Sequence, residues 1–166
     1  MEQKAPTAAA PKKPRASGTN THIAGEMFVA AELAKRGYSV SLTMGNAKAV
    51  DLFAEKDGRA ICIQVKAIAH KRNVGWPLNP DLSRILDGVI YVCVILNGLD
   101  EPPTYYVLPP AEVRKRGKRY NTRAILDIGK VRGTEFLGAW HLIDAALTKP
   151  EDAIGKPLRK RPVTIK

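Results

Sequence analysis

The chain has 166 residues, with 27 Lys and Arg against 16 Asp and Glu, and its formal net charge is +11. This length predicts one compact domain. The positive charge raises the local concentration of polyanions and favours a nucleic-acid partner, although ribosome-associated and merely soluble basic proteins share this balance.

The chain lacks the run of about 20 apolar residues that a membrane span needs. Its first residues also lack the apolar core of a secretory signal, so we expect a cytoplasmic protein with no membrane partner. Residues 1–20 and 149–166 are rich in Pro and in basic residues, with net charges of +3 and +4. They cannot bury enough apolar area to offset the entropy of ordering, which predicts a disordered basic N-terminal arm, a domain over residues 21–148 and a basic C-terminal tail.

The first predicted element is a helix over residues 23–36, with Thr21 as its N-cap and Gly37 at its end. Its apolar and small residues recur at helical spacing: Ile23, Met27, Ala30, Ala31 and Ala34. Residues 38–43 then alternate between apolar and hydroxyl side chains, which is typical of a half-buried strand.

The next two predicted strands, residues 50–55 and 60–67, flank the pair Asp57–Gly58, which strongly indicates a tight hairpin turn. With this turn Lys56 pairs with Arg59, and the same register places Asp51 opposite Gln64. Side-chain alternation then puts Asp51, Phe53 and Glu55 on one face together with Cys62, Gln64 and Lys66.

Beyond the hairpin, residues 73–80 read as a loop, and residues 87–96 are nearly continuous β-branched and aromatic, as in a strand buried on both faces. Residues 104–108 form a further predicted strand, a short helix runs from Pro110 to Gly117, and residues 136–147 form a closing helix that carries Trp140. No element is predicted between these two helices. Cys62 and Cys93 lie within apolar runs and are expected to be reduced thiols. The order of elements predicts an α/β fold with a mixed sheet flanked by helices.

Gln64 and Lys66 are unusual in this pattern because they interrupt an otherwise apolar strand. Burying an amide and an ammonium costs several kcal/mol unless each has a partner. One explanation is structural: an edge strand with one wet face, or an ion pair between Lys66 and Asp51. The other is chemical, because a carboxylate with a neighbouring oxygen ligand can hold Mg²⁺ and a nearby ammonium can stabilise charge on a phosphate.

Three segments carry a resemblance to a known family: Gly25-Glu26 with Leu33-Ala34-Lys35-Arg36-Gly37-Tyr38, then Gly45-Asn46 with Asp51-Leu52, and then Ile63-Gln64-Val65-Lys66. Together they resemble the PD-(D/E)XK nuclease superfamily, and most of all its small archaeal-type Holliday-junction resolvases and related endonucleases. The resemblance spans residues 22–108. It implies a restriction-endonuclease-like fold and an Mg²⁺- or Mn²⁺-dependent DNA endonuclease of repair, recombination or restriction. Because nothing in the sequence resembles a base-reading helix or a target-recognition domain, we expect structure-selective or nonspecific cleavage. Such proteins are often homodimers that cut two strands symmetrically.

Carried over by residue, the resemblance makes Asp51 a metal ligand, Lys66 the motif lysine and Glu26 a further acidic ligand from the first helix. Gln64 stands where the motif prefers Glu or Asp, so the site loses one negative charge, although an amide carbonyl can still coordinate a cation. Without the resemblance, Glu26 reads as an ordinary exposed helix acid. Two other classes of function stay open: a catalytically inactive nucleic-acid-binding module on the same fold, marked by Gln64, and a basic RNA-associated protein.

Phosphate contacts are predicted at two basic groups: His70, Lys71 and Arg72, and the run Arg114, Lys115, Arg116, Lys118 and Arg119. The second group also fits a solvated helix end. His70 has a further reading as a general base. Trp76 either stacks on a base of branched DNA or covers the core as part of a loop.

Overall fold

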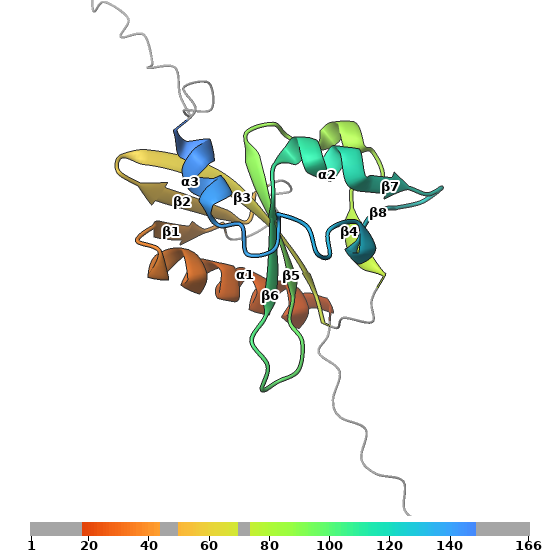
Figure 1. Ribbon diagram of the computed structural model, residues 1–166, viewed down its shortest axis with the longest axis horizontal. Coiled ribbons are helices and arrows are strands. Elements are labelled where there is room, and N and C mark those ends of the chain that lie inside the picture. Colours follow the sequence, from red (N-terminus) through yellow and green to blue (C-terminus); the bar gives the residue numbers. More distant parts are fainter. Residues whose placement is uncertain (1–17, 44–49, 70–73, 149–166) are drawn as a thin grey trace, which may run out of the picture.

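The structure of the chain is a computed structural model that describes residues 18–43, 50–69 and 74–148 (Figure 1). A five-stranded mixed sheet forms its centre, in the order β1-β2-β3-β5-β6. These strands are β1 (Ser39–Leu42), β2 (Leu52–Lys56), β3 (Arg59–Ile68), β5 (Val89–Ile95) and β6 (Thr104–Leu108). β3 and β5 are parallel, and the neighbouring strands in this sheet pair antiparallel.

A second, three-stranded sheet lies beside the central one, in the order β4-β8-β7 (Figure 1). Its strands are β4 (Gly75–Leu78), β7 (Gly117–Arg119) and β8 (Ala124–Asp127). The helices are α1 (Gly18–Lys35), α2 (Pro110–Arg116) and α3 (His141–Leu147), with short 3₁₀ turns η1 (Leu82–Arg84) and η2 (Ile128–Lys130). Within the described part of the chain, no helix is long and apolar enough to cross a membrane.

The hairpin of β2 and β3 has the predicted register, with Lys56 opposite Arg59 and Leu52 opposite Ile63. Asp57 and Gly58 both adopt positive φ, 54° and 73°. Two successive left-handed residues match the twist of the flanking strands, which is why Asp-Gly favours this turn. The prediction of the hairpin is therefore confirmed.

The core has two layers, one on each face of the central sheet. One layer joins α1 and α3 to the inward residues of β2 and β3, among them Leu52, Ile63 and Val65. The other layer lies between the sheet and β4, α2 and β8, and contains Trp76 and Leu126. All seven residues of β5 are buried, because this strand contributes side chains to both layers. The predicted doubly buried strand is confirmed.

Two predicted boundaries at helices are wrong. α1 begins at Gly18, so Thr21 lies inside the helix rather than at its N-cap, and residues 18–20 of the predicted arm are helical. The closing helix begins at His141 and not at residue 136, because Gly138 has a left-handed φ of 60° that interrupts a helix. Leu137 instead bridges to Tyr106 of β6.

The predicted loop at residues 73–80 is also wrong, because it contains β4. Trp76 and Leu78 are buried, while Pro77 between them is exposed. Proline is tolerated here because β4 is an edge strand, where a missing N–H removes no essential ladder bond. Gly75 meets the backbone of β8 so closely that a Cβ atom would lie 2.1 Å from the Leu126 carbonyl oxygen. Gly and Pro thus permit a strand where composition indicates a loop.

Candidate active site

The site is built around Asp51, the residue immediately before β2. Its backbone N–H donates to the Ile63 carbonyl at 2.9 Å, and its carbonyl accepts the Thr43 N–H at 2.9 Å. Its carboxylate oxygen Oδ2 accepts hydrogen bonds from the Gln64 side-chain amide and from the Val65 N–H, the latter at 2.7 Å. Asp51 is therefore fixed between β1 and β3, and the predicted juxtaposition of Asp51 and Gln64 is confirmed.

Gln64 lies in the interior of the sheet, since β3 is flanked by β2 and β5, and it is only 5% exposed. The edge-strand explanation is therefore wrong. A buried amide needs a partner, and here the partner is the Asp51 carboxylate. Within the described ranges no ion pair joins Lys66 to Asp51, so the alternative of a structural ion pair is also wrong.

Lys66 follows Gln64 by two residues and is half-buried on the same face of β3. Glu26 comes from α1, which packs on the opposite face. Burial raises the pKa of the Glu26 carboxyl, and the nearby charge of Asp51 raises it further, whereas His22 and Lys66 lower it. Glu26 therefore interacts electrostatically with Asp51 and with Lys66, although it comes from a different element.

The donor chemistry of this group suits a hard divalent cation. Asp51 and Glu26 provide carboxylate oxygens, and Gln64 provides an amide oxygen, which are the ligands that Mg²⁺ prefers. The two carboxylates repel one another, and a bound cation would relieve this repulsion. Over residues 18–43, 50–69 and 74–148, no three His, Cys, Asp or Glu side chains gather as a metal-ligand set. A metal here would thus use the two carboxylates, the amide and water.

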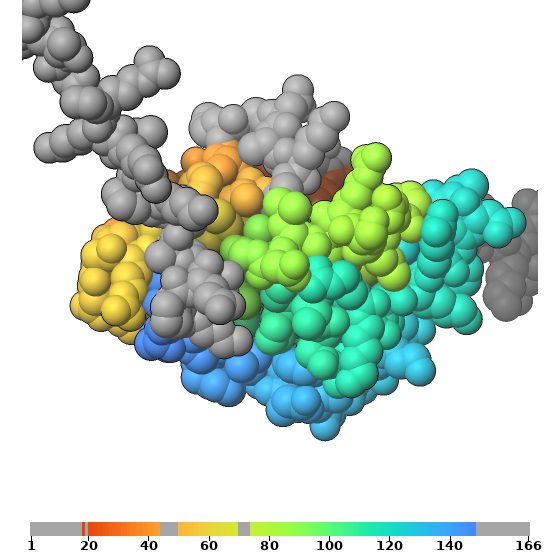
Figure 2. All heavy atoms as spheres, turned by 90° about the horizontal axis from the view of Figure 1, so that it is seen from above, coloured from red at the N-terminus to blue at the C-terminus, as the bar shows by residue number. Residues whose placement is uncertain are grey.

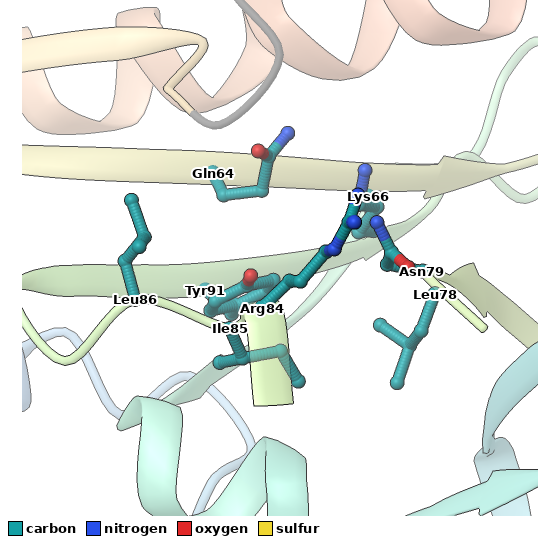
Figure 3. A pocket seen from close by; sticks show the side chains of 8 residues that line it. All are labelled: Gln64, Lys66, Leu78, Asn79, Arg84, Ile85, Leu86 and Tyr91. Atoms are coloured by element: carbon teal, nitrogen blue, oxygen red, sulfur yellow. The ribbon is translucent and has the colours of Figure 1, made fainter. Parts of the chain in front are cut away.

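A hollow opens beside Gln64 and Lys66 (Figure 3). Sequence reasoning missed three of its polar residues: Asn79, Arg84 and Tyr91. Tyr91 lies directly beside Gln64 on the neighbouring strand β5. Arg84 belongs to η1, a single turn too short to leave a periodic pattern in the sequence. Asn79 could be found only as part of the Asn79-Pro80-Asp81 turn, which by itself indicates a loop.

The basic run at α2 and β7 divides into two kinds of residue. Arg114 donates to the Ile85 carbonyl at 2.7 Å and pairs with Asp87, and Arg116 bonds Glu112 and the Lys130 carbonyl, each at 2.8 Å. These two arginines are thus engaged within the protein. The exposed members are Lys115, Lys118 and Arg119. In Figure 2 the atoms of residues 74–90 and those of α2 and β7 form a continuous part of one face.

Trp76 does not offer a surface for stacking on a base. Its side chain is fully buried, its indole N–H donates to the Val94 carbonyl at 2.9 Å, and its ring packs edge-on against Tyr106. The prediction of a DNA contact at Trp76 is therefore wrong, and the alternative that it covers the core is confirmed. His70, Lys71 and Arg72 lie outside the described residues.

Comparison with known proteins supports the fold. No family model matches the chain, and no curated protein matches its sequence. The bacterial homing endonuclease I-Ssp6803I has a similar structure, with a TM-score of 0.56 and 19% identity over 80% of this chain and 95% of that one. Hjc, a Holliday junction resolvase from Archaeoglobus fulgidus, gives a TM-score of 0.45 and 14% identity over 66% of this chain and 86% of that one. The predicted α/β fold, a mixed sheet with flanking helices, is confirmed, because the chain shares it with the homing endonuclease.

Proposed function

We propose that the protein is a DNA endonuclease that depends on Mg²⁺ or Mn²⁺ and uses Asp51, Gln64, Glu26 and Lys66. The observation that supports this most is the contact between the Asp51 carboxylate and the Gln64 amide, next to Lys66 and an exposed hollow. The similar homing endonuclease supports it at the level of the fold.

Each residue has a role in this proposal. Asp51, Glu26 and the Gln64 carbonyl would hold the cation, which supplies an activated water and neutralises phosphate charge when bound. The Val65 N–H keeps the Asp51 carboxylate in one orientation. The Lys66 ammonium stabilises the charge that develops on the phosphate. The exposed bases Lys115, Lys118 and Arg119 would hold the backbone without reading sequence, which favours a structure-selective or nonspecific enzyme.

Cleavage of supercoiled, linear, single-stranded and four-way-junction DNA tests the proposal, with Mg²⁺, Mn²⁺ or EDTA. We expect Asp51→Asn and Lys66→Ala to lower the cleavage rate about 100-fold or more, because each removes a group that acts on the transition state. Asp57→Asn is the matched control: it removes the same charge at a turn position with φ of 54°, which asparagine accepts. Absence of cleavage by the wild type with both metals, or full activity of Asp51→Asn, contradicts the proposal.

The second candidate function is a catalytically inactive DNA-binding module. Gln64 favours it, because its N–H satisfies the Asp51 carboxylate without any cation. DNA binding by the wild type and by Lys66→Ala, without cleavage by either, identifies this function.

A further inference from the structure

The hollow beside the candidate site brings two cationic side chains together from distant parts of the sequence. Lys66 comes from β3 and Arg84 from η1, and both line the hollow with Asn79 and Tyr91. Figure 3 shows the Arg84 side chain extending toward Lys66 and Asn79. Like charges repel when they share a small space, and an anion between them would relieve this repulsion.

The acidic partner of Arg84 neutralises it only weakly. The Arg84 Nε atom lies 3.5 Å from an Asp81 oxygen, and the two side chains are 73% and 50% exposed. Ion pairs as exposed as this one are largely screened by water and contribute little to stability. Asp81 is also engaged by the Ser83 N–H at 3.1 Å and the Ser83 hydroxyl at 2.6 Å. Arg84 therefore keeps most of its capacity to bind another anion.

The backbone that carries Arg84 is held in place before any ligand binds. Asp81 caps η1 by accepting a hydrogen bond from the Ser83 N–H. Ile85, the residue after Arg84, is buried, and its carbonyl accepts a hydrogen bond from Arg114 of α2 at 2.7 Å. A cation on a fixed backbone loses less conformational entropy on binding than one on a free loop. This also explains the position of Arg114, which supports η1 rather than facing solvent.

We propose that the hollow is a phosphate subsite for the DNA strand, in which Arg84 binds a backbone phosphate next to the one held at Asp51 and Gln64. The inference rests on the proposed function and extends it to the substrate. The planar guanidinium matches phosphate oxygens with two parallel N–H donors, and the Asn79 amide and Tyr91 hydroxyl add neutral donors from two sides. Arg84 is thus a substrate-positioning residue that brings the scissile bond to the metal ligands.

Binding of a fluorescent DNA duplex to the full chain, measured by anisotropy in EDTA over a range of salt concentrations, tests the inference. We expect Arg84→Ala to weaken binding about 5- to 10-fold and to reduce the slope of log affinity against log salt by about 1, as for one lost phosphate contact. Arg84→Lys should restore the slope but only part of the affinity, since lysine lacks the paired donors.

Arg59→Ala is the matched control. Arg59 is an exposed arginine at the turn end of β3, seven residues and roughly 23 Å from Lys66, so its loss changes net charge equally but leaves the hollow intact. We expect its salt slope to equal that of the wild type. Equal affinities and slopes for Arg84→Ala and Arg59→Ala would overturn the inference.

The two proposals fail separately because this binding assay contains no metal. If the wild type cuts no DNA while Arg84→Ala still loses affinity and slope, the endonuclease proposal fails and the phosphate subsite stands. If the wild type cuts DNA and Arg84→Ala binds and cuts it equally well, the subsite alone fails.

Discussion

At the scale of single residues, Gln64 decides how the candidate site behaves without metal. Its amide, in an interior strand and only 5% exposed, donates to the Asp51 carboxylate. A glutamate here would leave two carboxylates facing one another, and such a pair stays ionised only with a cation between them. The glutamine therefore satisfies the Asp51 carboxylate in the folded state without a cation.

The variant Gln64→Glu tests this directly. In EDTA at neutral pH we expect a loss of about 1–3 kcal/mol in the free energy of unfolding, because a buried hydrogen bond becomes a repulsion. Excess Mg²⁺ should restore most of that loss, as measured by thermal unfolding with and without the metal. Gln64→Met is the control of similar size: it also loses the hydrogen bond, but Mg²⁺ should not restore its stability. Equal effects of Mg²⁺ on wild type and Gln64→Glu would contradict the assigned ligands.

At the scale of elements, the Asp144 carboxylate joins α3 to the start of β1 and the end of β2. Asp144 accepts a hydrogen bond from the Tyr38 hydroxyl at 2.6 Å and lies 3.0 Å from the Lys56 ammonium. The Lys56 nitrogen also lies 4.8 Å from the centre of the Tyr38 ring. The Tyr38 hydrogen bond, followed by Lys56, lowers the pKa of Asp144. We therefore expect the docking of α3 to depend on pH.

We expect Tyr38→Phe to lower the free energy of unfolding by about 1 kcal/mol at pH 7, since it removes one hydrogen bond to a charged group. A carboxyl whose folded pKa is depressed contributes stability above its unfolded pKa, about 3.9, and loses it as the pH falls through the lower folded value. The difference between wild type and Tyr38→Phe should therefore shrink from pH 7 to pH 3 in urea titrations. Tyr105→Phe keeps its ring beside Trp140 and should show no such change. A constant difference for Tyr38→Phe would refute the link.

The elements that could be predicted are those fixed by local chemistry. The Asp57–Gly58 turn sets the register of β2 and β3, and this register places Asp51 beside Gln64. The second sheet could not be predicted, because β4 pairs with a strand almost fifty residues later and its Gly and Pro resemble a loop. Arg84 could not be predicted as a site residue either, because it is distant in sequence from Gln64 and Lys66. Only the packing of η1 beside β3 and β5 brings it to the site.

At the scale of the whole molecule, more of the net positive charge lies in the two ends of the sequence than between them. Residues 21–148 carry 17 bases and 13 acids, whereas the two ends together add +7. β7 and the segment that contains η1 both form part of the face seen in Figure 2, and β7 carries two exposed bases. The ends should therefore supply long-range attraction for a polyanion, and the body should supply its placement.

Removal of residues 1–17 tests this division and leaves α1 whole, since the helix begins at Gly18. We expect the slope of log affinity for DNA against log salt concentration to fall by up to about 3. The midpoint of thermal unfolding should not change. The full chain with its four basic residues in this segment replaced by glutamine should behave in the same way, which separates charge from chain length. Identical slopes for the truncated and full chains would exclude a DNA-contacting arm.

The two tryptophans of the chain lie in different layers of the core, Trp76 under the second sheet and Trp140 beside α3. Each is at most 8% exposed, and each packs edge-on against a different tyrosine of β6. Indole emission shifts to longer wavelength when water reaches the ring, so the protein has one tryptophan reporter for each face of its central sheet. Their separate spectra would reveal whether the small sheet detaches while the helical side stays closed.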